Sequence, residues 1–252
     1  MKSKITSKNF KLCYPILEDN ISSFEKKVST FSKEKNVYIE LRIDYLLKKN
    51  IPIDKIILSI NRLCEKYKRL EFIATIRTEG EDLHLSNSIY FDYIFFIYFL
   101  TDVKIIDVEF AYYKKDKKKY DRLFALGKKK VIFSTHIFDK IFSVNKYDKL
   151  YRETKIVDKG IIKFAVKVYS KKDLYLFMNK SREYSLDVDT KKKECIFIAM
   201  GESGMVSRIF PEYTNTKIVF VSAYSGKHNS LGQLDKNTYL KYRKLLAKRL
   251  EN

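Results

Sequence analysis

The sequence predicts a single-domain (β/α)₈ barrel spanning residues 1–252, and two observations predict this fold class. Short apolar, β-branched runs alternate with helical patterns along the whole chain, and no Pro- or Gly-rich linker divides it. A chain of 252 residues, 45% of them hydrophobic, is long enough to bury the core of such a barrel. An unbroken series of eight βα units favours a closed barrel over a doubly wound sheet.

Eight runs of residues have the composition expected of strands. Most of them are continuously apolar at their centres, which is typical of parallel strands covered on both faces. The predicted strands are residues 10–16, 37–43, 71–77, 104–110, 131–136, 161–168, 194–200 and 217–222.

The stretches between these runs carry the apolar spacing of helices. Apolar residues recur at intervals of three and four residues over 21–31 and again over 56–67. Ser170 and Asp173 have the spacing of a capping box, so we expect a helix to begin there. Asp235 is the expected N-cap of the last helix.

The chain is strongly basic, because 51 Lys and Arg residues against 31 Asp and Glu residues give a formal net charge of +20. Such a charge makes nucleic acid or a membrane surface a candidate partner. The Lys-rich clusters at 114–119 and 128–130 flank one predicted helix and lack an aromatic platform for single strands. We therefore expect no nucleic-acid partner, and we expect the positive field to favour a small anionic substrate.

Cysteine usage and hydropathy predict a cytoplasmic protein without a membrane partner. Cys13, Cys64 and Cys195 form no CxxC pair and lie in apolar stretches, so we expect buried thiols and no disulfide scaffold. The most apolar segment, 89–100, is interrupted by Asp92 and is shorter than the ~20 residues of a membrane span. The N-terminus has no apolar signal core. No HExxH or similar spacing indicates a metal site.

Charged side chains collect where the predicted strands end, which is where (β/α)₈ barrels place their chemistry. Such side chains are costly inside apolar strands unless they are paired or used, so their number indicates a site. The residues concerned are Glu40, Arg42, Arg77, Asp107, Glu109, His136, Lys163 and Arg208. The arginines suit a carboxylate or phosphate ligand, or they balance the neighbouring carboxylates, and the pattern leaves both readings open.

Lys163 is the most informative of these residues, because it lies in the apolar strand sequence IIKFAV. The strand period of two places it on the same face as Lys167. Burial and a second cation favour the neutral amine, which attacks a ketone. A structural ion pair with Glu40 or Glu109 explains the pattern equally well. His136 is the natural acid–base partner, or a strand-end histidine with a structural hydrogen bond.

An ordered set of motifs, covering nearly the whole chain, resembles the type I 3-dehydroquinate dehydratase family of the shikimate pathway. The motifs are ELRID at 40–44, TIRTEGE at 75–81, IIDVEF at 105–110, VIFSTHIF at 131–138, IIKFAVKV at 161–168, AMGESGMVSRIF at 199–210 and LGQL at 231–234. The resemblance implies a (β/α)₈ barrel that dehydrates 3-dehydroquinate to 3-dehydroshikimate through a lysine imine. It also implies a homodimer that needs no cofactor.

The resemblance further implies a role for individual residues. Lys163 matches the imine-forming lysine, His136 the general acid–base residue, and Glu81 the carboxylate that orients the histidine. Arg208 matches the arginine that binds the substrate carboxylate. The other substrate-binding positions implied by the resemblance are Glu40, Arg42, Arg77, Asn229, Ser230 and Gln233.

Some segments depart from the family pattern. The family has Glu-Gly-Gly after the strand-three arginine; here Glu81 has the right spacing, and Glu79 offers a second register. Ile137 follows the histidine where the family has Asp, and Lys167 replaces an uncharged residue. The closing loop reads NSLGQ at 229–233 instead of SAPGQ, so either of its first two residues takes the place of the serine.

Two competing functions are compatible with the same barrel. One is another imine-forming enzyme, such as a class I aldolase, against which the MGxxGxxSR segment and the glutamine loop argue. The other is a barrel that has lost catalysis and serves as a binding module, which the altered segments favour.

Overall fold

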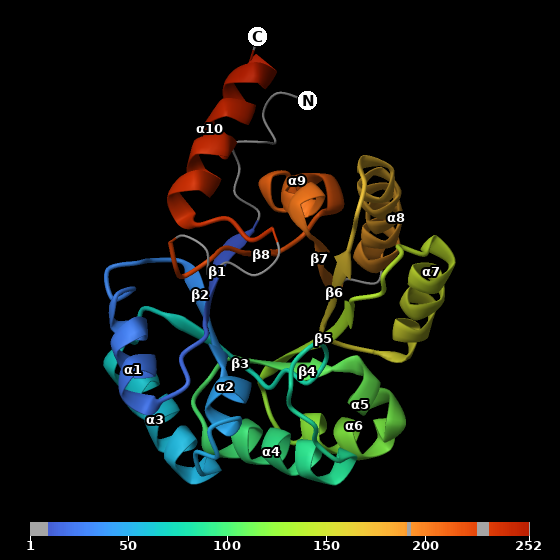
Figure 1. Cartoon of the computed structure of the whole chain (residues 1–252). Coiled ribbons are helices and arrows are strands. Elements are labelled where there is room, and N and C mark those ends of the chain that lie inside the picture. The colour runs from blue at the N-terminus through green and yellow to red at the C-terminus, as the bar shows by residue number, and fades with distance from the viewer. Residues whose placement is uncertain (1–9, 191–192, 226–231, 252) are drawn as a thin grey trace. The chain divides into compact units, whose positions relative to one another are not determined.

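The computed structural model describes residues 10–190, 193–225 and 232–251, in which strands and helices alternate (Figure 1). The strands are β1 (Lys11–Ile16), β2 (Val37–Arg42), β3 (Glu71–Thr75), β4 (Ile105–Glu109), β5 (Lys130–Ile137), β6 (Ile161–Lys167), β7 (Glu194–Met200) and β8 (Ile218–Phe220). All eight predicted strands are present, and their ends lie within two residues of the prediction.

The helices lie between these strands and after the last of them. They are α1 (Ile21–Ser29), α2 (Ile43–Leu47), α3 (Ile53–Lys66), α4 (Asn87–Leu100), α5 (Phe110–Lys115), α6 (Lys117–Ala125), α7 (Val144–Glu153), α8 (Lys171–Thr190), α9 (Met205–Ile209) and α10 (Lys236–Glu251). Within the described ranges, none of them is both long and apolar enough to cross a bilayer.

The strands form one sheet in the order β7-β6-β5-β4-β3-β2-β1-β8. The pairings β1–β8, β2–β3, β3–β4, β4–β5 and β6–β7 are parallel. Next to β8, the backbone N–H of Lys217 donates to the carbonyl oxygen of Cys195 in β7 at 3.0 Å, so the two ends of this order also meet. Sequential parallel strands with helices between them have the topology of a (β/α)₈ barrel, which confirms the predicted fold class.

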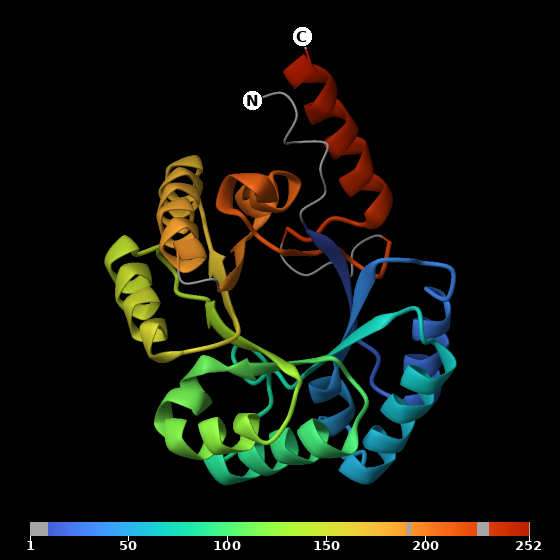
Figure 2. The same cartoon turned by 180° about the vertical axis from the view of Figure 1, so that it is seen from behind.

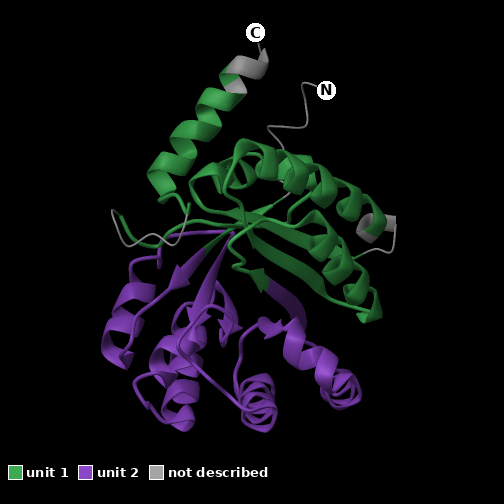
Figure 3. Ribbon diagram, turned by 45° about the vertical axis from the view of Figure 1, so that its right-hand side comes forward, with its two compact units in different colours: residues 1–13, 136–252 green, residues 14–135 purple. Residues whose placement is uncertain are grey.

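The chain comprises two compact units, coloured separately in Figure 3. Unit 1 contains residues 1–13 and 136–252, and unit 2 contains residues 14–135. Lys163, His136 and Arg208 therefore belong to unit 1, and the strand-end residues of β2 and β3 belong to unit 2.

Unit 2 packs amphipathic helices against its parallel strands. In α3, Ile56, Ile60 and Leu63 are buried, which confirms the helical spacing predicted there. The helices of this unit lie on one side of β2, β3 and β4 in both views (Figures 1 and 2). Burying each such aliphatic side chain contributes about 1.5–3 kcal/mol.

Unit 1 is held by aromatic packing behind β6 and β7. Tyr147 of α7 is fully buried, and its ring lies 5.3 Å from that of Phe164 in β6 and 5.4 Å from that of Phe177 in α8. Its hydroxyl shares a 2.8 Å hydrogen bond with Ser181. Because the polar tip of the ring is satisfied, the cluster keeps the benefit of apolar burial without an unpaired hydroxyl.

Helix α8 begins at the capping box that the sequence predicts. The Ser170 Oγ accepts the N–H of Asp173 at 3.1 Å, and the Asp173 carboxylate accepts the N–H of Ser170 at 3.1 Å. At the start of α10, Asp235 accepts the N–H of Thr238 at 3.1 Å, as predicted. These side chains pair N–H groups that the first turn of a helix leaves without a partner.

We expect Ser170→Ala to lower the free energy of unfolding by about 1 kcal/mol, because it removes one of the two reciprocal capping bonds. Urea denaturation followed by circular dichroism measures this change. Lys172→Ala, at an exposed neighbour in the same turn, is the control and should change the value by less than about 0.5 kcal/mol. Equal losses in both variants would contradict the capping role.

Candidate active site

The residues predicted for catalysis and substrate binding lie in both units. Unit 1 contains Lys163, His136, Arg208 and Gln233, and unit 2 contains Glu40, Arg42, Arg77 and Glu81. Asn229 and Ser230 lie outside the described residues.

Lys163 is the buried lysine among the unit 1 residues. It is in the middle of β6, opposite Ile196 of β7, and its side chain is only 3% exposed. Its Nζ lies 4.3 Å from the centroid of the Phe220 ring in β8. An amine against the face of an aromatic ring loses contact with water but keeps a favourable electrostatic neighbour when it is protonated. The strand therefore presents a buried primary amine beside an aromatic ring.

His136 lies near the end of β5, the strand next to β6 in the sheet. It is half-buried, and its ring stacks on that of Phe138 at a centroid distance of 6.2 Å and an angle of 17°. The Tyr169 hydroxyl donates to the carbonyl oxygen of Asp139 at 2.6 Å and ties the loop after β6 to the loop after β5. The loop that follows the histidine is thus anchored to the loop after β6.

Arg208 is a buried cation of α9, 5% exposed. Its Nη1 donates to the carbonyl oxygen of Ala199 at 2.8 Å, whereas its Nε has no hydrogen-bond partner. Among the residues that the structure describes, no carboxylate forms an ion pair with it. Burial lowers the pKa of Arg208 to about 10. A buried guanidinium with an unused N–H is suited to an incoming carboxylate.

The MGxxGxxSR segment explains how Arg208 is positioned. The Ser207 Oγ accepts the N–H of Ala199 at 3.0 Å and donates to the carbonyl oxygen of Gly204 at 2.8 Å. A Cβ on Gly204 would lie 2.3 Å from the carbonyl oxygen of Ala199, and Gly201 has a φ of 95°. The glycines therefore let the chain turn tightly after β7, and the serine fastens that turn.

The segment after β8 returns to the same turn. A Cβ on Gly232 would lie 2.1 Å from the carbonyl oxygen of Gly201, so the two backbones are in direct contact there. Gln233 follows directly and is 8% exposed. The predicted glutamine is thereby placed beside the turn that carries Arg208.

In unit 2, Arg77 is neutralised by two buried carboxylates. Its guanidinium donates to Asp107 at 2.8 Å, to Glu109 at 3.1 Å and to the Ser134 hydroxyl at 2.8 Å. Burial opposes its charge, but Asp107 and Glu109 outweigh burial and raise the pKa of Arg77. The sequence left open whether the arginines bind an anionic ligand or balance neighbouring carboxylates. In the structure, Arg77 balances neighbouring carboxylates.

Arg42 and Glu81 form a second ion-pair network in unit 2. Arg42 donates to Asp44 at 2.8 and 2.9 Å and to Glu81 at 2.6 Å, and Lys48 donates to Glu81 at 2.7 Å. Burial would raise the pKa of Glu81, but the bonds from Lys48 and Arg42 lower it on balance. The carboxylate of Glu81 is therefore held ionised. Glu40 is buried and accepts the Thr75 hydroxyl at 3.0 Å.

Sequence reasoning missed two residues that contact the predicted site residues, Asp44 and Phe220. Asp44 is fully buried and accepts the backbone N–H of Arg77 at 3.2 Å in addition to the Arg42 side chain. Phe220 supplies the ring beside Lys163. The signal for Asp44 was present, since it closes the ELRID motif, whereas an aromatic residue in an apolar strand carries no signal of a site.

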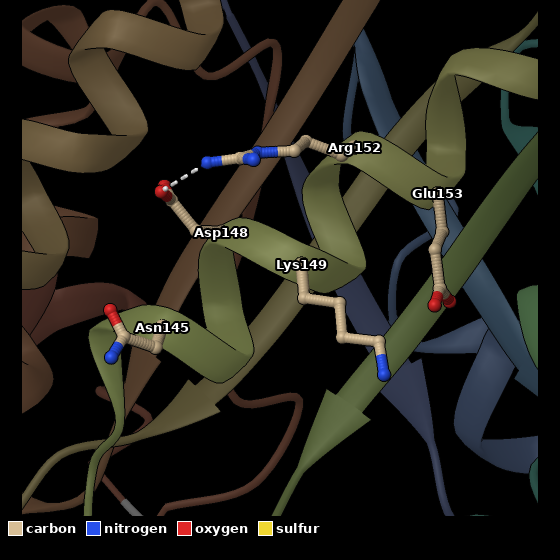
Figure 4. Close-up of a pocket in the computed structure, with 5 residues that line it drawn as sticks. All are labelled: Asn145, Asp148, Lys149, Arg152 and Glu153. Carbon is tan, nitrogen blue, oxygen red and sulfur yellow. Dashed lines mark hydrogen bonds and ion pairs between the residues drawn. The ribbon is translucent and has the colours of Figure 1, made fainter.

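A depression of about 580 Å³ lies along α7, apart from any residue predicted for catalysis (Figure 4). Its lining residues are Asn145, Asp148, Lys149, Arg152 and Glu153. Asp148 and Arg152 form an ion pair of 3.2 Å one turn apart. Because all five residues come from one helix, the depression is an open surface without convergent groups. Among the described residues, no group of His, Cys, Asp and Glu is arranged to hold a metal ion.

A (β/α)₈ barrel with a buried strand lysine, and a histidine on the neighbouring strand, is typical of enzymes that act through a lysine imine. The model of the type I 3-dehydroquinase family matches residues 12–248, and the chain therefore belongs to this family. The match confirms the resemblance that the motifs predicted and the enzyme class, a type I 3-dehydroquinate dehydratase.

Individual relatives agree with this membership. The 3-dehydroquinate dehydratase of Methanococcus vannielii is 30% identical over 230 residues, which cover 89% of this chain and 94% of that protein. The dehydratase of Methanocaldococcus jannaschii is 27% identical over 231 residues, covering 90% and 94%. The solved structure of the Clostridium difficile type I enzyme has a TM-score of 0.81 at 22% identity, covering 95% of this chain and 92% of that one. This last likeness supports the fold.

We expect Gly204→Ala to lower the free energy of unfolding by about 1–3 kcal/mol, because the added Cβ meets backbone and not a movable side chain. The backbone of Gly204 has a φ of −79°, which alanine also adopts without strain. The loss of stability would therefore come from the close approach of the added Cβ alone. Chemical denaturation measures it, with Ser203→Ala as the neighbouring control. A stability equal to that of the unchanged protein would show that the β7 turn is not tightly packed.

Proposed function

We propose that the chain dehydrates 3-dehydroquinate to 3-dehydroshikimate through an imine on Lys163. The amine adds to the C3 ketone, and loss of water gives a protonated imine. The imine withdraws electrons and makes the C2 proton acidic enough for His136 to remove. The resulting enamine expels the C1 hydroxyl, which leaves as water with the proton from His136. Hydrolysis of the imine consumes one water, which balances the water lost when the imine formed. It releases the product and regenerates the amine.

The observation that carries this proposal is the burial of Lys163. Among the lysines that the structure describes, it alone is buried, although the chain is rich in this residue. Burying a lysine inside an apolar strand costs free energy. Holding an amine beside a bound ketone is a function that explains why the protein accepts this cost. Covalent catalysis divides one difficult elimination into easier steps.

His136 and Arg208 support the proposal from the same unit. A histidine on the strand next to β6 is the residue type that both takes and returns a proton near neutral pH. The unused Nε of Arg208 gives the substrate carboxylate a donor in a buried setting, where a charge-assisted bond is strong. The proposed substrate carries the ketone and the carboxylate that these groups require.

The remaining roles rest on the resemblance and stay predictions. The residues proposed to hold the substrate hydroxyls and to close the site are Glu40, Arg42, Arg77, Asn229, Ser230 and Gln233. The proposal that Glu81 orients His136 rests on the resemblance alone. The homodimer and the cytoplasmic location also stay predictions.

The imine is tested by incubating the protein with 3-dehydroquinate and borohydride and measuring its intact mass. We expect one reduced adduct that maps to the peptide containing Lys163, and no adduct and almost no turnover in Lys163→Ala or Lys163→Met. His136→Ala should still form the adduct, while turnover falls by about 10²–10⁴-fold.

Lys149→Ala, at an exposed lysine of α7, is the control and should behave like the unchanged protein. Full activity in Lys163→Met would reject the assignment. A folded, unchanged protein that binds 3-dehydroquinate but neither forms the adduct nor turns over would favour the binding module instead.

We expect Arg208→Met to raise the KM for 3-dehydroquinate by about 10- to 100-fold, because a buried bond to the substrate carboxylate is lost. Steady-state kinetics measures this, and trapping of the adduct at saturating substrate should persist. Arg122→Met, at an exposed arginine of α6, is the control. An unchanged KM in Arg208→Met would show that Arg208 does not bind the substrate carboxylate.

A further inference from the structure

The loop after β6 carries a tyrosine that is held by three separate contacts. Tyr169 follows the last residue of β6 by two positions and is 45% exposed. Its backbone N–H donates to the Asp173 carboxylate at 3.1 Å, and the Lys167 ammonium lies 5.1 Å from the centroid of its ring. Its hydroxyl donates to the carbonyl oxygen of Asp139 at 2.6 Å, a well-formed hydrogen bond. These contacts hold the ring in one place although much of its surface faces water.

The backbone of Tyr169 starts from a fixed point in the sheet. It continues directly from β6, the strand that carries Lys163. The N–H of Val168 donates to the carbonyl oxygen of Met200 at 3.0 Å, which fastens the end of β6 to the end of β7. The tyrosine therefore keeps a constant position relative to the strand of the proposed imine.

The hydroxyl of Tyr169 binds the loop that follows His136 on the neighbouring strand, β5 (Figure 1). The pairing of β5 with β4 ends at Ser134, two residues before the histidine. The end of β5 that carries the imidazole is therefore less restrained by β4 than the centre of the strand is. Phe138, whose ring stacks on that of His136, directly precedes Asp139 in the chain. The bond from Tyr169 thus fixes the residue next to the ring that packs on the histidine.

Asp139 is also held from a second element. Its carboxylate accepts the ammonium of Lys146 in α7 at 2.5 Å, while its carbonyl oxygen accepts the hydroxyl of Tyr169. The peptide after β5 is therefore bound both to α7 and to the loop after β6. Loss of the tyrosine hydroxyl would leave only the exposed ion pair, and exposed ion pairs restrain a chain weakly.

The position of His136 matters more to the proposed reaction than its presence alone. In that reaction the imidazole takes a proton from C2 and returns it to the leaving hydroxyl. A general base works only within about 2.6–3.2 Å of the atom that it deprotonates, and a misplacement of about 1 Å can cost about 10²-fold in rate. A histidine near a strand end therefore gains from a restraint outside its own strand.

We infer that Tyr169 is a positioning residue for His136. Its hydroxyl clamps the loop after β5 to the end of β6, and Phe138 passes this restraint to the imidazole. Tyr169 acts through the histidine and not on the substrate, so this role rests on the proposed function.

The test is a double-mutant cycle of Tyr169→Phe and His136→Ala, measured as kcat on 3-dehydroquinate. Tyr169→Phe removes the clamping bond and keeps the ring. We expect it to lower kcat about 3- to 30-fold, because the imidazole loses its position. In the His136→Ala background the same change should lower kcat by less than about twofold, because no imidazole is left to position.

Two further readouts separate positioning from a general effect on the fold. The KM of Tyr169→Phe, and its extent of borohydride adduct at saturating substrate, should stay within about twofold of the unchanged protein, because Lys163 and Arg208 keep their own contacts. Tyr175→Phe, which removes the hydroxyl of a 67% exposed tyrosine in α8, is the matched control and should leave kcat unchanged.

An unchanged kcat in Tyr169→Phe would overturn the positioning role and leave the imine mechanism intact. Equal losses in the presence and absence of His136 would also overturn it, because they would show an effect that does not pass through the imidazole. If the unchanged protein formed no adduct on Lys163 and no product, the proposed function itself would fail, and the role of Tyr169 with it.

Discussion

The cost of placing cations inside an apolar sheet is the constraint on which the rest of this structure depends. Arg77 and Arg208 are buried almost equally, at 4% and 5% exposure, yet their pKa values shift in opposite directions. Arg77 has Asp107 and Glu109 as partners, so its charge is compensated within the protein. Among the described residues, Arg208 has one hydrogen-bond partner, a carbonyl oxygen, and its Nε is unused. The desolvation of Arg208 is therefore a cost that a bound anion relieves.

The same contrast separates two kinds of motif in this sequence. In ELRID and TIRTEGE, the polar residues bind one another: Arg42 holds Asp44 and Glu81 in one network. In MGxxGxxSR, by contrast, the glycines and the serine serve backbone geometry, because Gly204 touches the Ala199 carbonyl and Ser207 fastens the turn. Their joint effect is to position one guanidinium. The proposed contact of that segment with the substrate is its last polar residue, Arg208.

The sequence predicted the fold and the local signals well, because these depend on short-range patterns. All eight strands and both helix caps follow from composition and spacing within a few residues. Strand ends were less predictable. Strand β3 ends at Thr75 instead of residue 77, where the N–H of Arg77 donates to Asp44. Strand β8 ends at Phe220, because the N–H of Ser222 turns to the Leu234 carbonyl oxygen.

The partners of the charged residues were the part that sequence could not supply. Arg77, which follows β3, pairs with carboxylates 30 and 32 residues away, and nothing in local spacing distinguishes it from Arg208. Phe220 lies 57 positions from the lysine that it covers, within a strand that reads as ordinary core. Residue type and strand position therefore located the candidate site, but only the fold shows which cations are already neutralised.

The net charge of +20 acts on a different scale from these buried groups. Exposed lysines are screened beyond about 8 Å at physiological salt, so their field influences how fast an anion arrives more than how well it is held. Arg208 is shielded from solvent, and its interaction with a carboxylate is screened much less. Selection of an anionic substrate should therefore depend on this one guanidinium and only weakly on salt, even in a protein with so many exposed lysines.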